Sequence, residues 1–146
     1  MTSLRHAGIV VSDLDRALYF YCDLLGLTLA RRMQESGPFV SSILGMENVE
    51  VETAKLAGED GSQLELLAFI QPVADLAPPP SLIRRGPTHI ALTVRNLDSL
   101  YARMAAQGVN FTTAPRVSVD GGAKVTFCRD PDGTYLELVE PLSKKP

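Results

Sequence analysis

The sequence predicts an α+β fold, in which two βαβββ modules form a curved, cleft-like mixed β-sheet with the helices outside. Three observations lead to this fold class. The chain contains an internal repeat, each copy reads as a strand followed by a helix and further strands, and a Pro-rich segment separates the copies. We expect a single domain spanning 1–146, with module 1 at about 4–70, a linker at about 71–87 and module 2 at about 88–141.

The repeat aligns "RHAGIVVSDLDRALYFYCDLLGL" near the N-terminus with "THIALTVRNLDSLYARMAAQGV" in the second half. His6 then falls on His89. In the second part of each copy an Asp-Gly pair is followed, four positions after the Gly, by a Glu among leucines, so that Glu65 falls on Glu137. Each half of the chain therefore begins with a His and ends with a Glu.

In module 1, residues 4–11 alternate as a strand does, and Ser12 or Asp13 is placed to cap a helix that ends near Leu25 before Gly26. Leucine-rich segments predict two more strands, and one segment is ambiguous between a lid loop and a strand with a short helix. The strands are expected at 49–56 and 62–70, with a turn at 58–61, and the ambiguous segment is 36–48.

Module 2 repeats this order, with a strand at 88–94 and a helix that Asn96 caps and that ends near Gln107. Three further strands and two Gly-containing turns follow. Glu140, Asp130 and Asp132 are interpreted as solvated or turn residues. The strands are expected near 109–113, 123–128 and 134–140, and the turns at 120–122 and 130–133.

Composition favours an ordinary globular protein, with 45% hydrophobic and 21% charged residues and a formal net charge of -3. We expect no nucleic-acid partner because no basic patch with interleaved aromatics is present, and no membrane span because no apolar run is long enough. The N-terminus lacks a signal-peptide pattern, and the two cysteines have no CxxC spacing, which predicts reduced thiols in the cytoplasm. A homodimer with a small-molecule substrate is expected.

The four repeated residues share a chemistry that points to a metal ion. Because side chains alternate along a strand, each His and each Glu lies on the face away from its aliphatic neighbours. A single His at a strand start usually packs without a ligand, and a single Glu in a strand is usually solvated. Here the two histidines of the chain lie in register, each with a matching Glu, and this donor set suits one divalent transition metal. The predicted ligands are His6, Glu65, His89 and Glu137.

The His-strand-helix-Gly opening, the second His in "THIALTV" and the terminal "DPDGTYLELVE" resemble the vicinal oxygen chelate superfamily, the glyoxalase and bleomycin-resistance fold. The resemblance covers nearly the whole chain. It implies paired βαβββ modules whose curved sheets form a cleft around one metal ion. Carried over by position, the quartet is similar to those of glyoxalase I, methylmalonyl-CoA epimerase and the epimerases that act on valiolones.

The resemblance implies a metal-dependent isomerase, epimerase or lyase that removes and returns a proton next to a chelated carbonyl group. Glu137 would be the catalytic base, with Glu65 as a second base on the opposite side. One divalent ion per site is expected, with Zn, Ni or Co first and Fe or Mn next. Candidate substrate contacts are the apolar residues Phe39, Ile43, Leu44, Met46, Phe69 and Phe127, and the cations Arg84, Arg85, Arg116 and Lys124.

Three other functions stay open on this scaffold. A non-haem Fe(II) extradiol-type dioxygenase would use two His and one carboxylate and would leave positions free for oxygen and substrate. A metal-dependent antibiotic-resistance protein, for example a thioltransferase acting on fosfomycin, would use His6, His89 and Glu137. A protein that sequesters a drug without catalysis is disfavoured, because the chain has no Trp and 6% aromatic residues.

Overall fold

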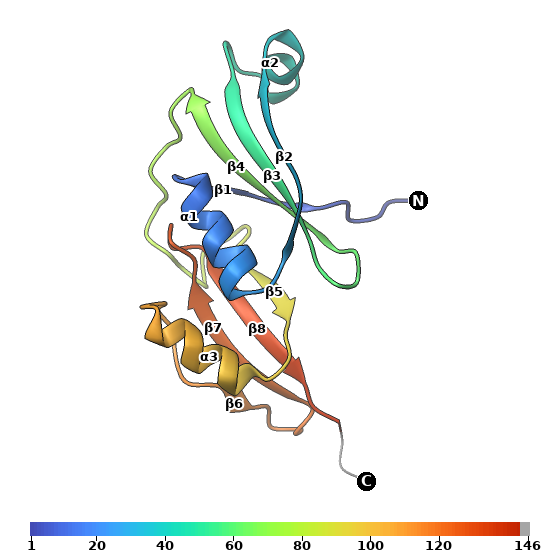
Figure 1. Ribbon diagram of the computed structural model, residues 1–146, viewed down its shortest axis with the longest axis vertical. Coiled ribbons are helices and arrows are strands. Elements are labelled where there is room, and N and C mark those ends of the chain that lie inside the picture. Colours follow the sequence, from blue (N-terminus) through green and yellow to red (C-terminus); the bar gives the residue numbers. More distant parts are fainter. Residues whose placement is uncertain (144–146) are drawn as a thin grey trace. The chain divides into compact units, whose positions relative to one another are not determined.

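The computed structural model describes residues 1–143 and divides the chain into two compact units, Met1–Leu76 and Ala77–Pro146 (Figure 1). The boundary falls inside the segment predicted as a linker. Each unit contains one four-stranded mixed sheet with its own helices. The predicted α+β fold class with two modules is thereby confirmed.

The first unit has strands in the order β1-β4-β3-β2, with β1 parallel to β4 and the other pairs antiparallel. Helix α1 continues directly into a turn of π-helix, η1, before the chain enters β2. The elements are β1 (Ala7–Val10), α1 (Leu14–Leu18), η1 (Tyr19–Leu24), β2 (Thr28–Ser36), α2 (Pro38–Leu44), β3 (Glu50–Ala57) and β4 (Gln63–Gln71).

The second unit repeats this topology, with the order β5-β8-β7-β6 and with β5 parallel to β8. Its register also matches, because Ala91 lies opposite Glu137 as Gly8 lies opposite Glu65. The internal repeat is therefore a repeat of structure. The elements are β5 (His89–Thr93), α3 (Leu97–Ala106), β6 (Arg116–Val117), β7 (Ala123–Arg129) and β8 (Tyr135–Pro141).

The ambiguous segment of module 1 resolves into the end of β2 and helix α2. Pro38 lies in the first turn of α2, where its missing N–H group costs no hydrogen bond, and Gly45 ends the helix in the left-handed region. Strand β2 was not expected from the sequence. Most of its side chains are exposed, so it lacks the alternation of buried and exposed residues that marks a strand.

The strand predicted near 109–113 is wrong. Phe111 forms only an isolated bridge to Cys128, and the edge strand of the second sheet is the two-residue β6, which follows Pro115. A proline has no N–H group to donate to a ladder, which explains why regular pairing begins only after it.

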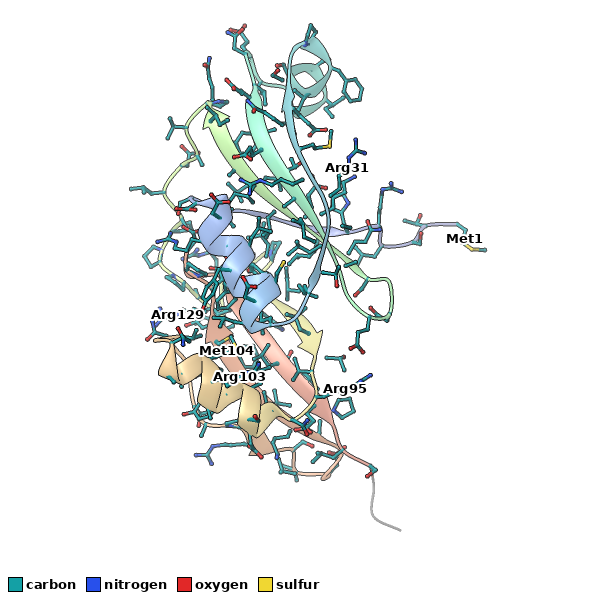
Figure 2. All side chains as sticks on the ribbon, in the orientation of Figure 1. Met1, Arg31, Arg95, Arg103, Met104 and Arg129 are labelled. Carbon is teal, nitrogen blue, oxygen red and sulfur yellow. The ribbon has the colours of Figure 1, made fainter. Side chains whose placement is uncertain are left out.

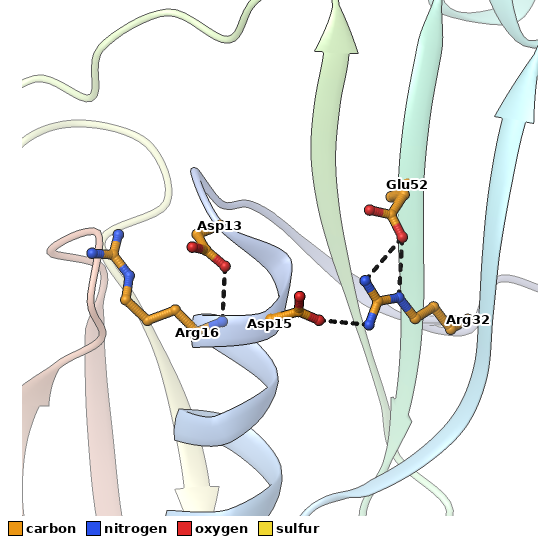
Figure 3. A network of polar contacts seen from close by, with 5 residues as sticks. All are labelled: Asp13, Asp15, Arg16, Arg32 and Glu52. Carbon is orange, nitrogen blue, oxygen red and sulfur yellow. Dashed lines mark hydrogen bonds and ion pairs between the residues drawn. The ribbon is translucent and has the colours of Figure 1, made fainter.

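Helix α1 is anchored on the first sheet by polar contacts that Figure 3 shows. The Asp13 carboxylate accepts a hydrogen bond of 2.9 Å from the backbone N–H of Arg16, so Asp13 is the N-cap. The Arg32 guanidinium on β2 donates to Asp15 at 2.7 Å and to Glu52 at 3.0 Å. Arg32 and Glu52 therefore project from the face of the sheet that carries α1.

The N-terminus of helix α3 is capped by a side chain of strand β8. Asn96 has a φ of 52° and makes no side-chain capping bond, contrary to the prediction. The carboxylate of Glu140 on β8 accepts from the backbone N–H groups of Asn96 at 3.2 Å and Leu97 at 3.1 Å. The interpretation of Glu140 as a solvated or turn residue was wrong. The local sequence does not show that strand pairing brings Glu140 next to the start of α3.

We predict that Glu140→Gln lowers the free energy of unfolding by about 0.5–1 kcal/mol, because it removes a negative charge from the positive end of a helix. Urea denaturation followed by circular dichroism measures the change. Glu47→Gln is the control, since Glu47 is exposed and has no hydrogen bond or ion pair among the described residues. Equal stability of the two variants would contradict the capping role.

The main core of each unit lies on the face of its sheet that carries α1 or α3, and the first unit has a second buried cluster, Val40, Val49 and Val51, on the opposite face. Leu64 and Leu66 are buried in the first sheet, and Leu136 and Leu138 in the second. Between β7 and β8 the chain turns at Asp130. Its buried carboxylate accepts hydrogen bonds from the backbone N–H groups of Asp132 and Thr134, in agreement with its predicted role in a turn. The glutamates that alternate with these leucines project from the other face.

Two further expectations concern membranes and thiols. In the described part of the chain no helix is both long and apolar enough to span a bilayer. Cys22 and Cys128 are free thiols, as predicted. Burial, with a smaller contribution from Asp130, raises the pKa of Cys128 to about 12, so this thiol is neutral at physiological pH.

Candidate functional site

The first unit brings His6 and Glu65 together. His6 lies immediately before β1, and the parallel pairing of Gly8 with Glu65 sets the two side chains on the same face. The distance from His6 Nε2 to Glu65 Oε2 is 3.2 Å. Glu65 is largely covered, with 14% of its side chain exposed, whereas His6 is 36% exposed. The pair is thus reachable from solvent through the imidazole.

The second unit presents the same arrangement in His89 and Glu137. His89 Nε2 lies 3.4 Å from Glu137 Oε2, and the exposed side-chain fractions are 36% and 25%. Each unit thus holds one His and one Glu of the predicted set of four, in contact with each other. Within each unit, no third His, Cys, Asp or Glu of residues 1–143 lies close enough to complete a set of three.

The spacing of the paired atoms fits two neighbouring ligands of one metal ion. Zn–N and Zn–O bonds are about 2.0–2.2 Å long, which puts adjacent ligand atoms about 3.0–3.4 Å apart at bond angles between octahedral and tetrahedral values. The two observed separations, 3.2 and 3.4 Å, fall in this range. Ordinary N–H···O hydrogen bonds are about 2.7–3.2 Å long. The 3.2 Å separation of His6 and Glu65 is at the upper end of that range, and the 3.4 Å separation of His89 and Glu137 exceeds it. The donor set therefore fits a divalent cation.

His89 has two neighbours that fix its ring. Its Nδ1 atom lies 2.9 Å from the hydroxyl oxygen of Thr88, and its ring meets Phe127 edge-on with a centroid distance of 5.3 Å. When Nδ1 carries the proton and donates to Thr88, Nε2 presents a lone pair toward Glu137 and any shared cation. Thr88 was missed by the sequence analysis, although it directly precedes His89.

Of the cationic candidates, Lys124 lies apart from the pairs, whereas Arg116 lies opposite Val125, on the same face of the second sheet as Glu137. Lys124 forms an ion pair with Asp98 of α3 and lies opposite Glu140, so it projects from the helix-bearing face. We therefore leave Lys124 out of the candidate site. Arg116 donates to the hydroxyl of Thr113. Arg84 donates to the Pro79 carbonyl, and the structure gives no reason to place Arg85 in the site.

The apolar candidates lie in three places. Phe127 lies directly opposite Glu137 and contacts His89, so it belongs to the surroundings of the second pair. Phe69 packs against the cluster Val40, Val49 and Val51 on the His6 face of the first sheet. The remaining four lie on α2 or directly after it and are exposed: Phe39, Ile43, Leu44 and Met46.

An open hollow of about 680 Å³ lies beside α2 in the first unit. Met46, Ser41 and Gln71 are among its lining residues, whereas neither His6 nor Glu65 is. Met46 thus lines a hollow that the His–Glu pair does not line. We base the candidate site on the pairs.

The two sheets share one topology, and each carries a His–Glu pair at the same register on the face opposite the one that carries α1 or α3. These features define a protein of duplicated βαβββ modules with a donor pair in each. The chain belongs to the Glyoxalase/Bleomycin resistance protein/Dioxygenase superfamily, whose family model matches residues 3–138. The resemblance inferred from the repeat is thereby confirmed.

Similar proteins carry names from this family. A probable lactoylglutathione lyase from Synechocystis sp. is 31% identical over 97% of this chain and 98% of that protein. A lactoylglutathione lyase from Schizosaccharomyces pombe is 32% identical over 98% of this chain, which spans about half (49%) of that protein. A glyoxalase family protein from Bacillus cereus superposes with a TM-score of 0.89 at 24% identity, over 98% of this chain and 96% of that one, and shows the fold.

Proposed function

We propose that the chain is a metal-dependent enzyme that moves a proton next to the carbonyl group of a small substrate. The observation that carries this proposal is the duplicated His–Glu pair, with Nε2 to Oε2 separations of 3.2 and 3.4 Å at equivalent register positions. A single pair of this kind is a common surface contact. Two of them on the repeated strands of a glyoxalase-superfamily chain favour a shared ligand.

His6, Glu65, His89 and Glu137 would hold one divalent cation, supplied either by one chain or by two copies in a homodimer. Two ionised carboxylates and two neutral imidazoles balance the charge of a divalent ion, which offsets the cost of half-burying the glutamates. Nitrogen and oxygen donors suit Zn, Ni and Co, and also Fe or Mn.

A bound divalent cation supplies positive charge beside a substrate oxygen on which negative charge develops. The side chains of the protein transfer the proton and position the ligands. Glu137 takes the substrate proton at a carboxylate oxygen and returns it, and Glu65 provides a second carboxylate for the opposite side of a planar intermediate. Phe127 shields the second pair from water on one side, while Thr88 holds the His89 ring in one orientation.

Among the proton-transfer reactions we favour a glyoxalase I-like lyase that acts on a hemithioacetal. Support comes from the relatives named lactoylglutathione lyase, at 31% and 32% identity. An epimerase acting on an acyl-CoA ester or a cyclic ketose is the second candidate, because carboxylates in both pairs provide two bases. Glu65 contacts His6 and is therefore placed to be a fourth protein ligand of the metal ion. Such a ligand disfavours a dioxygenase, because a dioxygenase needs open coordination positions for oxygen and substrate.

The test is solvent-proton exchange into the substrate in deuterated water. Protein loaded with Zn, Ni or Co is incubated with hemithioacetals, acyl-CoA esters and cyclic ketoses, and deuterium in the recovered compounds is measured by mass spectrometry. We expect incorporation with one of the three classes, lost after chelation and restored by the ion. Absence of exchange with every class and ion, together with oxygen uptake by Fe(II)-loaded protein and a catechol, would replace the proposal by dioxygenase chemistry.

A further inference from the structure

The His6 face of the first sheet carries two cations in the same row as Glu65. The register places Glu65 opposite Lys55 on β3, and Lys55 opposite Arg31 on β2. Residues directly opposite each other project from the same face, with Cβ atoms about 4.5–5.5 Å apart. Lys55 is therefore the immediate neighbour of Glu65, and Arg31 lies one strand further out.

Neither cation has a partner within the first unit. Lys55 is half-buried and Arg31 is exposed, and neither makes a hydrogen bond or ion pair with a described residue of that unit. Figure 2 labels Arg31 beside β2. The neighbouring Arg32 projects from the opposite face and is bound by Asp15 and Glu52. A partly covered ammonium group without a counter-ion is uncommon in a sheet and is suited to meet a ligand anion.

The second unit shows that this cation is not a general requirement of the fold. Its residue opposite Glu137, at the position equivalent to Lys55, is Phe127. Both His–Glu pairs have similar Nε2 to Oε2 separations, yet only the first has a cation directly opposite its carboxylate. In the second sheet Arg129 and Arg116 lie on the same face as Glu137, but opposite Tyr135 and Val125. The second pair forms with Phe127 at this position, so formation of the pair does not account for Lys55.

We propose that Lys55 and Arg31 bind an anionic group of the substrate, so that the substrate is a carbonyl compound that also carries a carboxylate or a phosphate. This inference rests on the proposed function, because it extends the same site. Lys55 supplies a compact ammonium, and the planar Arg31 guanidinium donates two parallel hydrogen bonds to an oxyanion. The anionic group lies roughly 5–10 Å from Glu65, the span of one to two strand spacings.

A structural role for Lys55 gives a different result. If the ammonium only offsets the charge of Glu65, replacing it changes metal affinity and leaves anion binding unaltered. Binding of anions to the metal-free protein separates these roles, since it does not depend on turnover or on a bound ion. It also separates failure of this inference from failure of the proposed function.

The experiment titrates the chelator-treated full chain with malonate and with inorganic phosphate, and follows backbone amide shifts by NMR. We expect shifts on β2, β3 and β4, and a dissociation constant that rises about tenfold or more in Lys55→Met and in Arg31→Met. Arg32→Met and Lys124→Met are matched controls, because each removes a cation from the helix-bearing face of a sheet. Both controls are expected to bind as the wild type does.

Tighter binding of malonate assigns a carboxylate, and tighter binding of phosphate assigns a phosphate. The inference is overturned if the wild type binds neither anion on these strands, or if the Lys55 and Arg31 variants bind as their controls do. Lys55→Gln replaces Lys55→Met if the latter does not fold. For a substrate found by proton exchange, we expect the same variants to raise KM by a similar factor and to leave kcat unchanged. If the protein binds the anions but exchanges no substrate proton, the anion site is retained and the proposed enzyme activity is rejected.

Discussion

Glu137→Gln is expected to reduce turnover by about 10²–10⁴-fold, the usual contribution of a positioned general base, while the fold stays intact. The amide has the size of the carboxylate and retains an oxygen toward His89, but it cannot accept the substrate proton. The decrease should appear in kcat, because substrate contacts elsewhere in the site are unchanged. Steady-state kinetics on the substrate identified by proton exchange measures it, with the metal content of each preparation determined in parallel.

The matched control is Glu140→Gln on the same strand. Glu140 lies three residues further along β8 and caps helix α3, so its replacement lowers stability and leaves kcat unchanged. The comparison isolates the role of a carboxylate on the His89 face from that of a carboxylate on β8 in general. Wild-type turnover by fully metallated Glu137→Gln would remove Glu137 from the role of base.

His6→Ala and His89→Ala are each expected to lose the bound metal ion. Removing a residue that only hydrogen-bonds to a metal ligand weakens metal binding by about 10–100-fold. Removing an imidazole that is itself a ligand should weaken metal binding by more than that. Elemental analysis after dialysis against a weak chelator should find about one ion per site in the wild type and a small fraction of that in both variants. The two variants should behave alike, because their histidines occupy equivalent positions.

Glu52→Gln is the control for a charge lost from the first sheet, since Glu52 contacts Arg32 on the helix-bearing face. It should retain the full complement of metal. If one of the two histidine variants also kept its metal while the other lost it, the ion would belong to a single His–Glu pair, and the shared site would be wrong.

The repeat made most of the fold and the set of four donor residues predictable. Because equivalent segments fold alike, alignment of His6 with His89 and of Glu65 with Glu137 was enough to select these four residues. The contact of each His with the Glu of its own unit was not predicted and follows from the register. Alternation along β4 and β8 correctly separated the buried leucines from the glutamates. These features depend on periodicity within a strand, which local sequence contains.

Features that depend on pairing between strands were not predictable. Glu140 reaches the start of α3 across 43 residues of sequence, and Lys55 meets Glu65 only through the antiparallel register of β3 and β4. The face from which Lys124 projects was hidden for the same reason, because it follows from the position of Lys124 opposite Glu140. Strand β2 escaped detection because tertiary pairing, rather than amphipathic alternation, determines its conformation.

The claim that one cation binds both histidines is tested most directly by X-ray absorption at the cobalt edge of Co(II)-loaded protein, since outer-shell scattering counts imidazole ligands. Two imidazoles per cobalt ion, with one ion bound per His6, Glu65, His89 and Glu137 set, is the expected result. One imidazole per ion, with two ions bound for each such set, would show that the pairs act separately and would contradict the shared centre.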